Sequence, residues 1–156
     1  IRILGRMDNT RTMKFVRRDY IREVENLDGY KVFMAKANGT GAFGETLTPP
    51  IVGEPSVGNT ETFISIGEFY TLSEAMALKK YIATKFVRAL LGALKTTQDI
   101  TPEKWKFVPQ QDFSETSDID WSLPVEEIDA FLYKKYKLTD AEICFINEKV
   151  QAMKDV

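Results

Sequence analysis

The first seventy residues contain short hydrophobic runs with the alternation typical of β-strands. YKVFMAK (30–36) and ETFISIGEF (61–69) have the clearest strand pattern, and IRILGR (1–6) and MKFVRRDYI (13–21) have a weaker one. Between the two clear strands, residues 39–59 hold five glycines and three prolines. This composition favours a surface loop over a helix or a central strand.

The next segment predicts one long amphipathic helix. Thr71 and Glu74 have the spacing of a capping box, and good helix formers follow for about six turns, to Lys95 or Thr96. At 100° per residue, a broad apolar face gathers Leu78, Ile82, Phe86, Val87, Ala89, Leu90, Ala93 and Leu94. The opposite sector gathers Tyr81, Thr84, Lys85, Arg88, Gly92 and Lys95.

The last fifty residues predict loops followed by two helices. FVPQQDF (107–113) is extended, and SETSDIDWSLP (114–124) is a polar loop anchored by Trp121. PVEEIDAFLYKKY (124–136) and LTDAEICFINEKVQAM (138–153) are helices; Pro124 suits a first turn, and Thr139 with Glu142 forms a second capping box. The whole chain therefore predicts an α+β fold with a mostly β N-terminal portion, a long glycine- and proline-rich loop, one long central amphipathic helix and a helical C-terminal tail.

Composition indicates one soluble domain spanning residues 1–156. Hydrophobic residues make up 44 % and charged residues 28 % of the chain, and no apolar run is long enough to cross a membrane. The only cysteine, Cys144, is expected to be a buried, inert thiol in a reducing, cytoplasmic setting. The absence of histidine removes Ser-His-Asp and Cys-His catalysis and histidine metal sites.

Charge is unevenly distributed along the chain. Residues 1–36 hold nine Lys/Arg against five Asp/Glu, a net charge of +4, and residues 99–156 hold seven against thirteen, a net charge of −6. A basic front and an acidic tail indicate asymmetric partners, although solvated faces that merely differ in charge give the same counts.

The stretch KANGTGAFGE (36–45) does not have the pattern of a nucleotide cradle. It lacks the lysine and Ser/Thr of a P-loop, and prolines rather than a helix follow it. Its glycines suit a plain turn or a loop whose backbone approaches another surface closely. Lys36 and Asn38 favour the recognition reading, because they can bind a phosphate and a base edge.

Clustered carboxylates raise the alternative of a metal-dependent nuclease. Asp118, Asp120, Glu126, Glu127 and Asp129 lie close together in sequence, but their positions are those of loop and first-turn residues, where carboxylates favour helix N-termini. We therefore assign no catalytic, cofactor-binding or metal-binding residue to this chain.

Five segments in a fixed order carry a resemblance to a known family. KVFMAKANGTGAFGE, IVGEPSVGNTETFISIGEF, EAMALKKYIATKFVRALLGALKTTQ, KFVPQQDF and EIDAFLYKKYKLTDAEICFINEKV resemble the C-terminal part of type II restriction-modification proteins, the adenine-specific DNA methyltransferases and their fusions with endonucleases. The resemblance covers roughly residues 30–153. It implies an excised target-recognition domain, consistent with a first residue, Ile1, that is not methionine.

The resemblance implies double-stranded DNA and the catalytic domain of the same parent chain as partners. Neither the Asn-Pro-Pro-Tyr motif nor the glycine-rich S-adenosylmethionine loop of the family is present, so S-adenosylmethionine, and Mg²⁺ where the parent cleaves DNA, are implied for the parent alone. From residue type we expect DNA contacts from three regions, the glycine loop, the long helix and its end, and the extended segment: Lys36, Asn38, Thr40, Lys85, Arg88, Lys95, Thr97, Gln98, Gln110 and Gln111.

A second hypothesis makes the chain a protein-interaction or scaffold module. The acidic tail ends in LYKKYKLTDAEICFINEKV (132–150), which could dock the catalytic domain or a partner subunit as an amphipathic helix.

Overall fold

The computed structural model describes residues 1–37, 39–94 and 100–153 of the chain. Within these residues the α+β prediction is confirmed. The strands are β1 (Arg2–Met7), β2 (Thr10–Phe15), β3 (Tyr30–Ala35), β4 (Ile51–Gly53), β5 (Val57–Asn59) and β6 (Phe63–Phe69). The helices are α1 (Leu72–Ala83), α2 (Lys85–Leu94), α3 (Pro102–Trp105), α4 (Val125–Lys135) and α5 (Asp140–Lys149), and two short 3-10 turns, Arg18–Tyr20 and Glu25–Asp28, precede β3.

The strands form two three-stranded sheets. One has the order β2-β1-β5, with β2 antiparallel and β5 parallel to β1, and the other has the order β4-β3-β6, with both neighbours antiparallel to β3. The short strands β4 and β5 lie inside the segment predicted to be a loop. Both are edge strands, the position that a segment rich in glycine and proline tolerates best.

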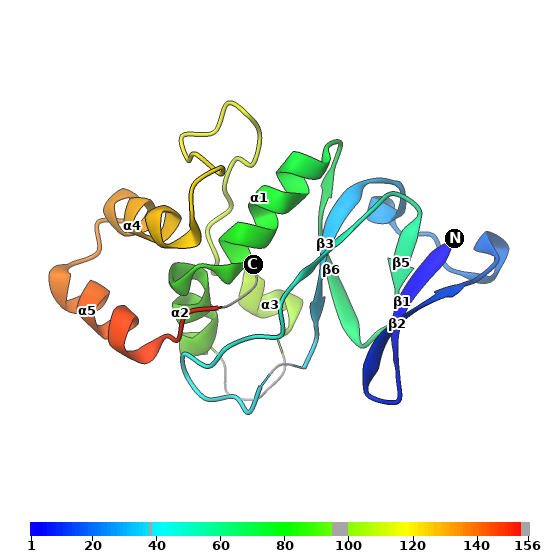
Figure 1. Cartoon of the computed structure of the whole chain (residues 1–156), viewed down its shortest axis with the longest axis horizontal. Coiled ribbons are helices and arrows are strands. Elements are labelled where there is room, and N and C mark those ends of the chain that lie inside the picture. Colours follow the sequence, from blue (N-terminus) through cyan, green and yellow to red (C-terminus); the bar gives the residue numbers. More distant parts are fainter. Residues whose placement is uncertain (38, 95–99, 154–156) are drawn as a thin grey trace.

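Strand β3 is buried on both faces because it lies between the other sheet and the helices. Val32 and Met34 pack into the main core with residues of α1, whereas Phe33 and Ala35 pack with Leu4 and other residues of the second core. This arrangement explains why five of the six residues of YKVFMA are buried. In Figure 1, α1 lies beside the β3–β6 sheet, α4 and α5 lie at one end of an elongated molecule, and the β1–β2 ribbon lies at the other.

The single long helix predicted from residue 71 onward is wrong: Thr84 divides it into α1 and α2. The Thr84 backbone is extended (φ −59°, ψ 148°), and its hydroxyl donates to the Tyr81 carbonyl at 2.7 Å and accepts from the Val87 N–H at 3.2 Å. Thr84 therefore ends α1 and caps α2.

The break changes which side chains are exposed. Tyr81 and Thr84, expected in the polar sector, are buried, and Ala93, expected on the apolar face, is exposed. Both sides of the helical segment are covered, because α4, α5 and the C-terminal residues pack on the side opposite β3.

Both predicted capping boxes are present at the N-termini of α1 and α5. The α4 helix begins at Val125, and Pro124, expected in its first turn, immediately precedes it. Trp121 anchors the polar loop as expected, because its Nε1 donates to the Asp112 carbonyl at 3.0 Å and to the Ser117 hydroxyl at 3.2 Å.

Candidate nucleic-acid interface

Six of the ten residues expected to contact DNA are described by the structure, and these six do not form one surface. Asn38, Lys95, Thr97 and Gln98 lie outside the described residues. Of the other six, Lys36, Thr40 and Gln110 are exposed, Lys85 is half-buried, and Arg88 and Gln111 are buried.

The expectation that Arg88 contacts DNA is wrong, because its side chain is buried. Its side chain is only 3 % exposed, its Nε donates to the Ala83 carbonyl at 3.2 Å, and its Nη2 donates to the Gln151 carbonyl. The helix break at Thr84 turns this arginine inward, where it fastens the C-terminal segment to α2.

Gln111 is also buried, at 6 % exposure, and serves the core rather than a base edge. Its amide nitrogen donates to the Tyr136 hydroxyl at 2.7 Å, and its amide oxygen accepts from Lys135 Nζ at 3.0 Å. A glutamine whose donor and acceptor are both satisfied inside the protein is not available to adenine. The neighbouring Gln110 remains exposed.

The glycine loop that follows β3 is closed by its own carboxylate. Glu45 Oε2 accepts from the Thr40 N–H at 2.7 Å and from its hydroxyl at 3.1 Å, and Oε1 accepts from the Gly41 N–H at 2.9 Å. Gly39 has a positive φ of 63°, and a Cβ there would lie 2.1 Å from Glu45 Cδ. The loop is thus a nest of amides built around an anion, and Glu45 occupies it.

Lys36 lies at the start of this loop on a fixed backbone. Its N–H donates to the Thr62 carbonyl at 3.0 Å, and its carbonyl accepts from the Ile100 N–H at 2.9 Å. The side chain of Lys36 is exposed. Lys85, in contrast, is directed at Asn147, whose backbone and side-chain oxygens both lie 3.3 Å from its Nζ.

The structure reveals a basic surface that the residue-by-residue prediction missed, the antiparallel β1–β2 ribbon (residues 2–15). Asp8 and Asn9 form its two-residue turn with φ values of 49° and 64°, the left-handed values that a tight hairpin needs. The ribbon contains four Lys/Arg against Asp8 alone, a net charge of +3. The clusters of strand-type residues on both sides of Asp8-Asn9 are the sequence signal that predicts this hairpin.

Arg6 and Arg11 lie directly opposite each other on the ribbon. Like charges in this cross-strand position destabilise a sheet. Arg6 donates to the Asn9 side chain and carbonyl, and Arg11 donates to the Pro49 carbonyl at 2.7 Å, so neutral oxygens bind both guanidinium groups. Partial burial and the neighbouring Arg6 lower the pKa of Arg11. In the described part of the chain, the hydrogen bonds of this pair go to neutral oxygens and not to a carboxylate.

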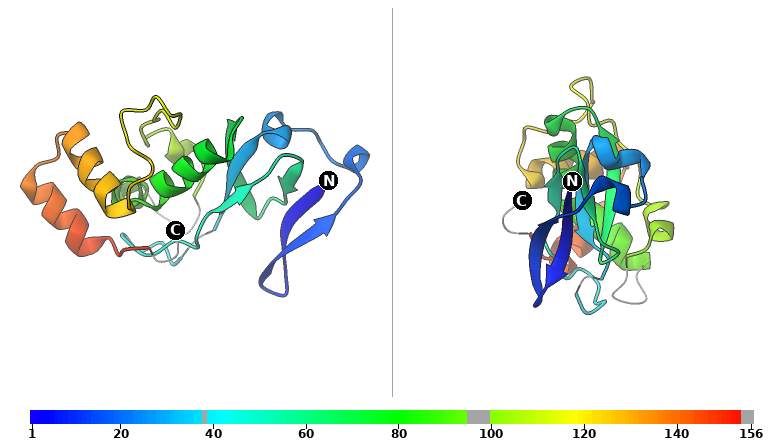
Figure 2. Two further views of the ribbon diagram at one scale, coloured as in Figure 1. Left: turned by 45° about the horizontal axis from the view of Figure 1, so that its top comes forward. Right: turned by 90° about the vertical axis from the view of Figure 1, so that its right-hand side faces the viewer.

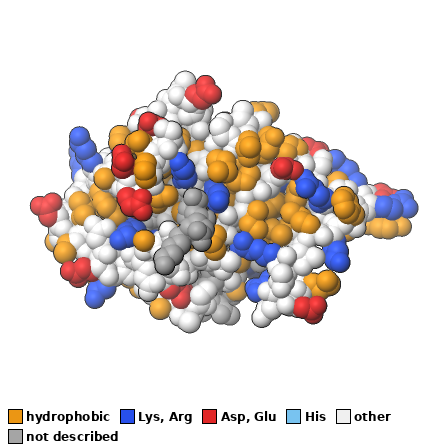
Figure 3. Space-filling model, viewed as in Figure 1, with side chains coloured by type: hydrophobic (Ala, Val, Ile, Leu, Met, Phe, Trp, Pro, Cys, Tyr) orange, Lys and Arg blue, Asp and Glu red, His pale blue; other side chains and the backbone are white. Residues whose placement is uncertain are grey.

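More cations and exposed apolar side chains follow along β2, toward the end of the ribbon away from the turn. Lys14 is exposed, and Phe15, at the end of β2, is 87 % exposed. Just beyond, the Arg17 guanidinium stacks over the Tyr20 ring, 4.9 Å from its centroid. Figure 2 shows the ribbon projecting from the end of the molecule, free of the helices. On the face drawn in Figure 3, blue side chains are interspersed with hydrophobic ones over the strand-rich half, and red ones are more frequent over the helical half.

Three of the carboxylates considered for a nuclease have separate structural partners. Asp118 pairs with Lys135 at 2.8 Å, Asp120 accepts from the Ser122 N–H and hydroxyl, and Asp129 lies at the N-terminus of α2. Among the described residues, no group of three His, Cys, Asp or Glu side chains is arranged to hold a metal ion. The expectation that Cys144 is buried is wrong: Cys144 is exposed on α5, a helix that buries Ile146 against the core.

Comparisons with protein-family models, curated proteins and solved structures find no match to this chain. In the described part of the chain, no helix has both the length and the apolar character needed to cross a membrane.

Proposed function

We propose that this chain is the double-stranded DNA-binding specificity domain of a cytoplasmic type II restriction-modification protein. The domain holds and reads duplex DNA, while the remainder of the parent chain, with S-adenosylmethionine, modifies adenine. The observation that carries the proposal is the β1–β2 ribbon, in which Arg6 and Arg11 face each other and, among the described residues, hydrogen-bond to neutral oxygens rather than to a carboxylate. The ordered resemblance of residues 30–153 to the C-terminal part of this family supports it independently.

The shape of the ribbon suits DNA as a partner. The major groove of B-DNA admits a two-stranded β-ribbon, and several DNA-binding proteins insert strands there. The ribbon of this chain projects away from the helices (Figures 1 and 2), so a duplex can approach it without steric conflict with α4 or α5. In this arrangement Arg6, Arg11 and Lys14 contact backbone phosphates, and these contacts fix the position of the protein on the duplex.

Sequence reading then falls to exposed residues outside the ribbon that present donors and acceptors. Lys36 and the glycine loop, which Glu45 holds in shape, are described candidates from the sequence prediction, and the Gly44 carbonyl of this loop accepts from the Gln151 N–H that follows α5. Gln110 is a further exposed candidate.

The proposal is tested by fluorescence anisotropy with a labelled mixed-sequence duplex at several salt concentrations. We expect log affinity to fall linearly with log salt, with a slope of about −0.9 for each phosphate neutralised. Binding that is absent at 20 mM salt, or binding that does not depend on salt, would contradict a phosphate-contacting domain.

A second candidate function, docking of the catalytic part of the parent chain, is favoured by an apolar groove between α2 and α5. Phe43, Phe86, Leu90, Leu138 and Phe145 line it, and half of the Phe145 surface is exposed. Exposed apolar grooves are typical of protein interfaces. Three results together would favour this function over the first. The chain would not bind DNA, it would co-purify with the catalytic part at high salt, and the Phe145→Ser variant would no longer co-purify.

A further inference from the structure

Strand β2 has one long edge with no strand of this chain beside it among the described residues. It is the first strand in the order β2-β1-β5, so β1 covers only one of its two edges. The amino group of Ile1 donates to the Val16 carbonyl at 2.9 Å, and the Val16 N–H donates to the Ile1 carbonyl at 3.0 Å. Hydrogen-bonded and non-hydrogen-bonded residues alternate along an antiparallel pair, so the even-numbered residues of β2 bond to β1 and the odd-numbered ones point outward.

The outward residues of β2 are Arg11, Met13 and Phe15. Within the residues that the structure covers, no hydrogen bond outside the strand pairing engages their backbone N–H or C=O groups. These groups form a row of donors and acceptors along the open edge. Such a row is a template for pairing with another strand.

The side chains beside this edge are apolar and exposed. Met13 is 42 % and Phe15 is 87 % exposed, although both lie on the same face of the ribbon as the buried Leu4, which is directly opposite Met13. The core therefore ends at β1 and does not extend over this part of β2. Figure 2 shows the ribbon projecting from the body of the protein, which leaves room for a further strand.

A second copy of the same strand fits this edge. Antiparallel pairing centred on Met13 is the register that uses all three outward residues, with Met13 facing Met13 and Arg11 facing Phe15 of the second copy. The same register places Lys14 opposite Thr12. Charged residues on an edge strand often prevent pairing, but here every cation faces a neutral side chain. Registers centred on Arg11 or Lys14 place like charges opposite each other and are destabilised.

We propose that β2 pairs with β2 of a second copy of this chain, so that the two β2-β1-β5 sheets join across a twofold axis at Met13. Each of the three facing pairs exchanges two backbone hydrogen bonds. This is a small interface, so we expect a dimer that dissociates on dilution. The pairing uses backbone atoms and leaves the cationic side chains on the faces of the sheet. The inference goes beyond the proposed function and does not depend on DNA binding.

The association is tested by sedimentation velocity of the whole chain, without DNA, over a hundredfold range of protein concentration. We expect a monomer at the lowest concentration and an increasing fraction of dimer as the concentration rises. A monomer at every concentration overturns the proposal and leaves the edge of β2 to a strand of another protein.

Opposite charges at Phe15 test whether this edge forms the dimer. Phe15 faces Arg11 of the second copy, and the pair occurs twice in each dimer, so Phe15→Glu should dimerise about tenfold more tightly than Phe15→Lys. Met7 is the matched control, because it is 51 % exposed on β1 of the same ribbon and does not reach the second copy. Met7→Glu and Met7→Lys should show no such difference. An equal difference at both positions, or none at Phe15, overturns the proposal.

Engineered cysteines test the register. All variants carry Cys144→Ser, because the native thiol is exposed. With oxidised glutathione as the oxidant, Met13→Cys should form a disulfide-linked dimer, since the Cα atoms of a hydrogen-bonded pair are about 5.5 Å apart. The two copies of the exposed Lys14 lie diagonally, about 7–8 Å apart, so Lys14→Cys should form the linked dimer more slowly. Faster linking through Lys14→Cys, or no linking through either variant, overturns the proposal.

Discussion

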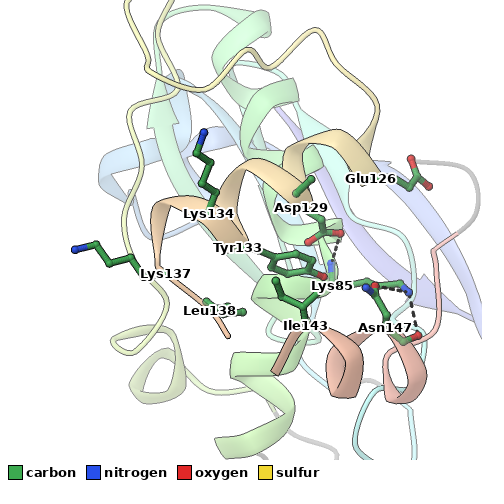
Figure 4. A pocket seen from close by; sticks show the side chains of 10 residues that line it. Lys85, Glu126, Asp129, Tyr133, Lys134, Lys137, Leu138, Ile143 and Asn147 are labelled. Carbon is green, nitrogen blue, oxygen red and sulfur yellow. Dashed lines mark hydrogen bonds between the residues drawn. The ribbon is translucent and has the colours of Figure 1, made fainter. Parts of the chain in front are cut away.

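The Asp129 carboxylate of α4 accepts the backbone N–H of Phe86, the second residue of α2, at 2.9 Å. Its other oxygen accepts the N–H of Lys85 at the same distance. Together with Thr84, which accepts the N–H of Val87, this contact satisfies the first three amide groups of α2. Thr84 and Asp129, which are 45 positions apart in sequence, therefore make a new helix start at Lys85, inside a segment whose sequence predicts one continuous helix. Figure 4 shows the contact between Asp129 and Lys85.

Asp129 should make stability depend on pH in an unusual direction. Burial raises the pKa of Asp129 to about 6, more than its amide and Arg88 contacts lower it. Because the folded state then holds the proton more tightly than the unfolded state, the contribution of Asp129 to stability is complete below about pH 4 and is lost as pH rises through 6.

The measurement is urea unfolding of wild type and Asp129→Asn between pH 4 and 7. The free energy of unfolding of wild type relative to Asp129→Asn should fall by at most about 3 kcal/mol over this range. The difference isolates Asp129 from acids such as Asp28 and Asp112, whose lowered pKa values act in the opposite direction. A difference that rises with pH would show that the pKa of Asp129 is depressed instead.

The helix break predicts a specific response at Thr84. Thr84→Ala removes the hydroxyl that caps α2 and leaves the buried Val87 N–H unpaired, which should cost about 1–2 kcal/mol in the free energy of unfolding. Thr84→Ser keeps the hydroxyl and should cost less than half as much. Equal losses in urea unfolding of the two variants would assign the effect to the methyl group rather than the cap.

Lys31 is a buried cation with three backbone acceptors. Its Nζ donates to the carbonyls of Asn26, Leu27 and Gly29 at 2.9, 2.6 and 2.8 Å, and its side chain is 1 % exposed. Lys31→Met should destabilise the fold by about 3 kcal/mol, because three carbonyls lose their donor. The exposed Lys14→Met is the matched control and should change the free energy of unfolding by less than about 0.5 kcal/mol.

The glycine loop should loosen without Glu45. Glu45→Ala removes the acceptors of the Thr40 and Gly41 N–H groups, so hydrogen exchange at these two amides should accelerate at least about tenfold. Exposed Glu61→Ala serves as the control and should leave exchange at residues 40 and 41 unchanged. Unchanged exchange in Glu45→Ala would mean that other contacts hold the loop.

Local patterns predicted the elements of this fold better than they predicted which side chains are exposed. Each capping box depends on contacts between residues at most three positions apart, and the two predicted at Thr71 and Thr139 are both present. Arg88 and Gln111, in contrast, are buried by segments distant in sequence, the Gln151 carbonyl and the Tyr136 hydroxyl. Projecting residues 71–96 on a single helical axis gives the correct exposed side only if the helix is continuous. The break at Thr84, where Asp129 caps α2, changes the axis, so the projection misplaced the side chains that follow.

The candidate interface was only partly predictable for a similar reason. The charge count located the excess of positive charge in the first 36 residues, but residue types alone drew attention to the glycine loop and the long helix. The pairing of Arg6 with Arg11 depends on the register of the hairpin, which the Asp8-Asn9 turn sets.

The central claim, that the ribbon contacts DNA phosphates, is tested most directly by duplex binding at several salt concentrations with two double variants. Arg6→Ala/Arg11→Ala removes the ribbon pair, and Lys134→Ala/Lys137→Ala removes the same charge from the far end of the molecule. We expect the ribbon variant to lower affinity and to reduce the slope of log affinity against log salt by up to about 1.8, two contacts at 0.9 each. The control should keep the wild-type slope. Equal slopes for wild type and the ribbon variant would contradict the account.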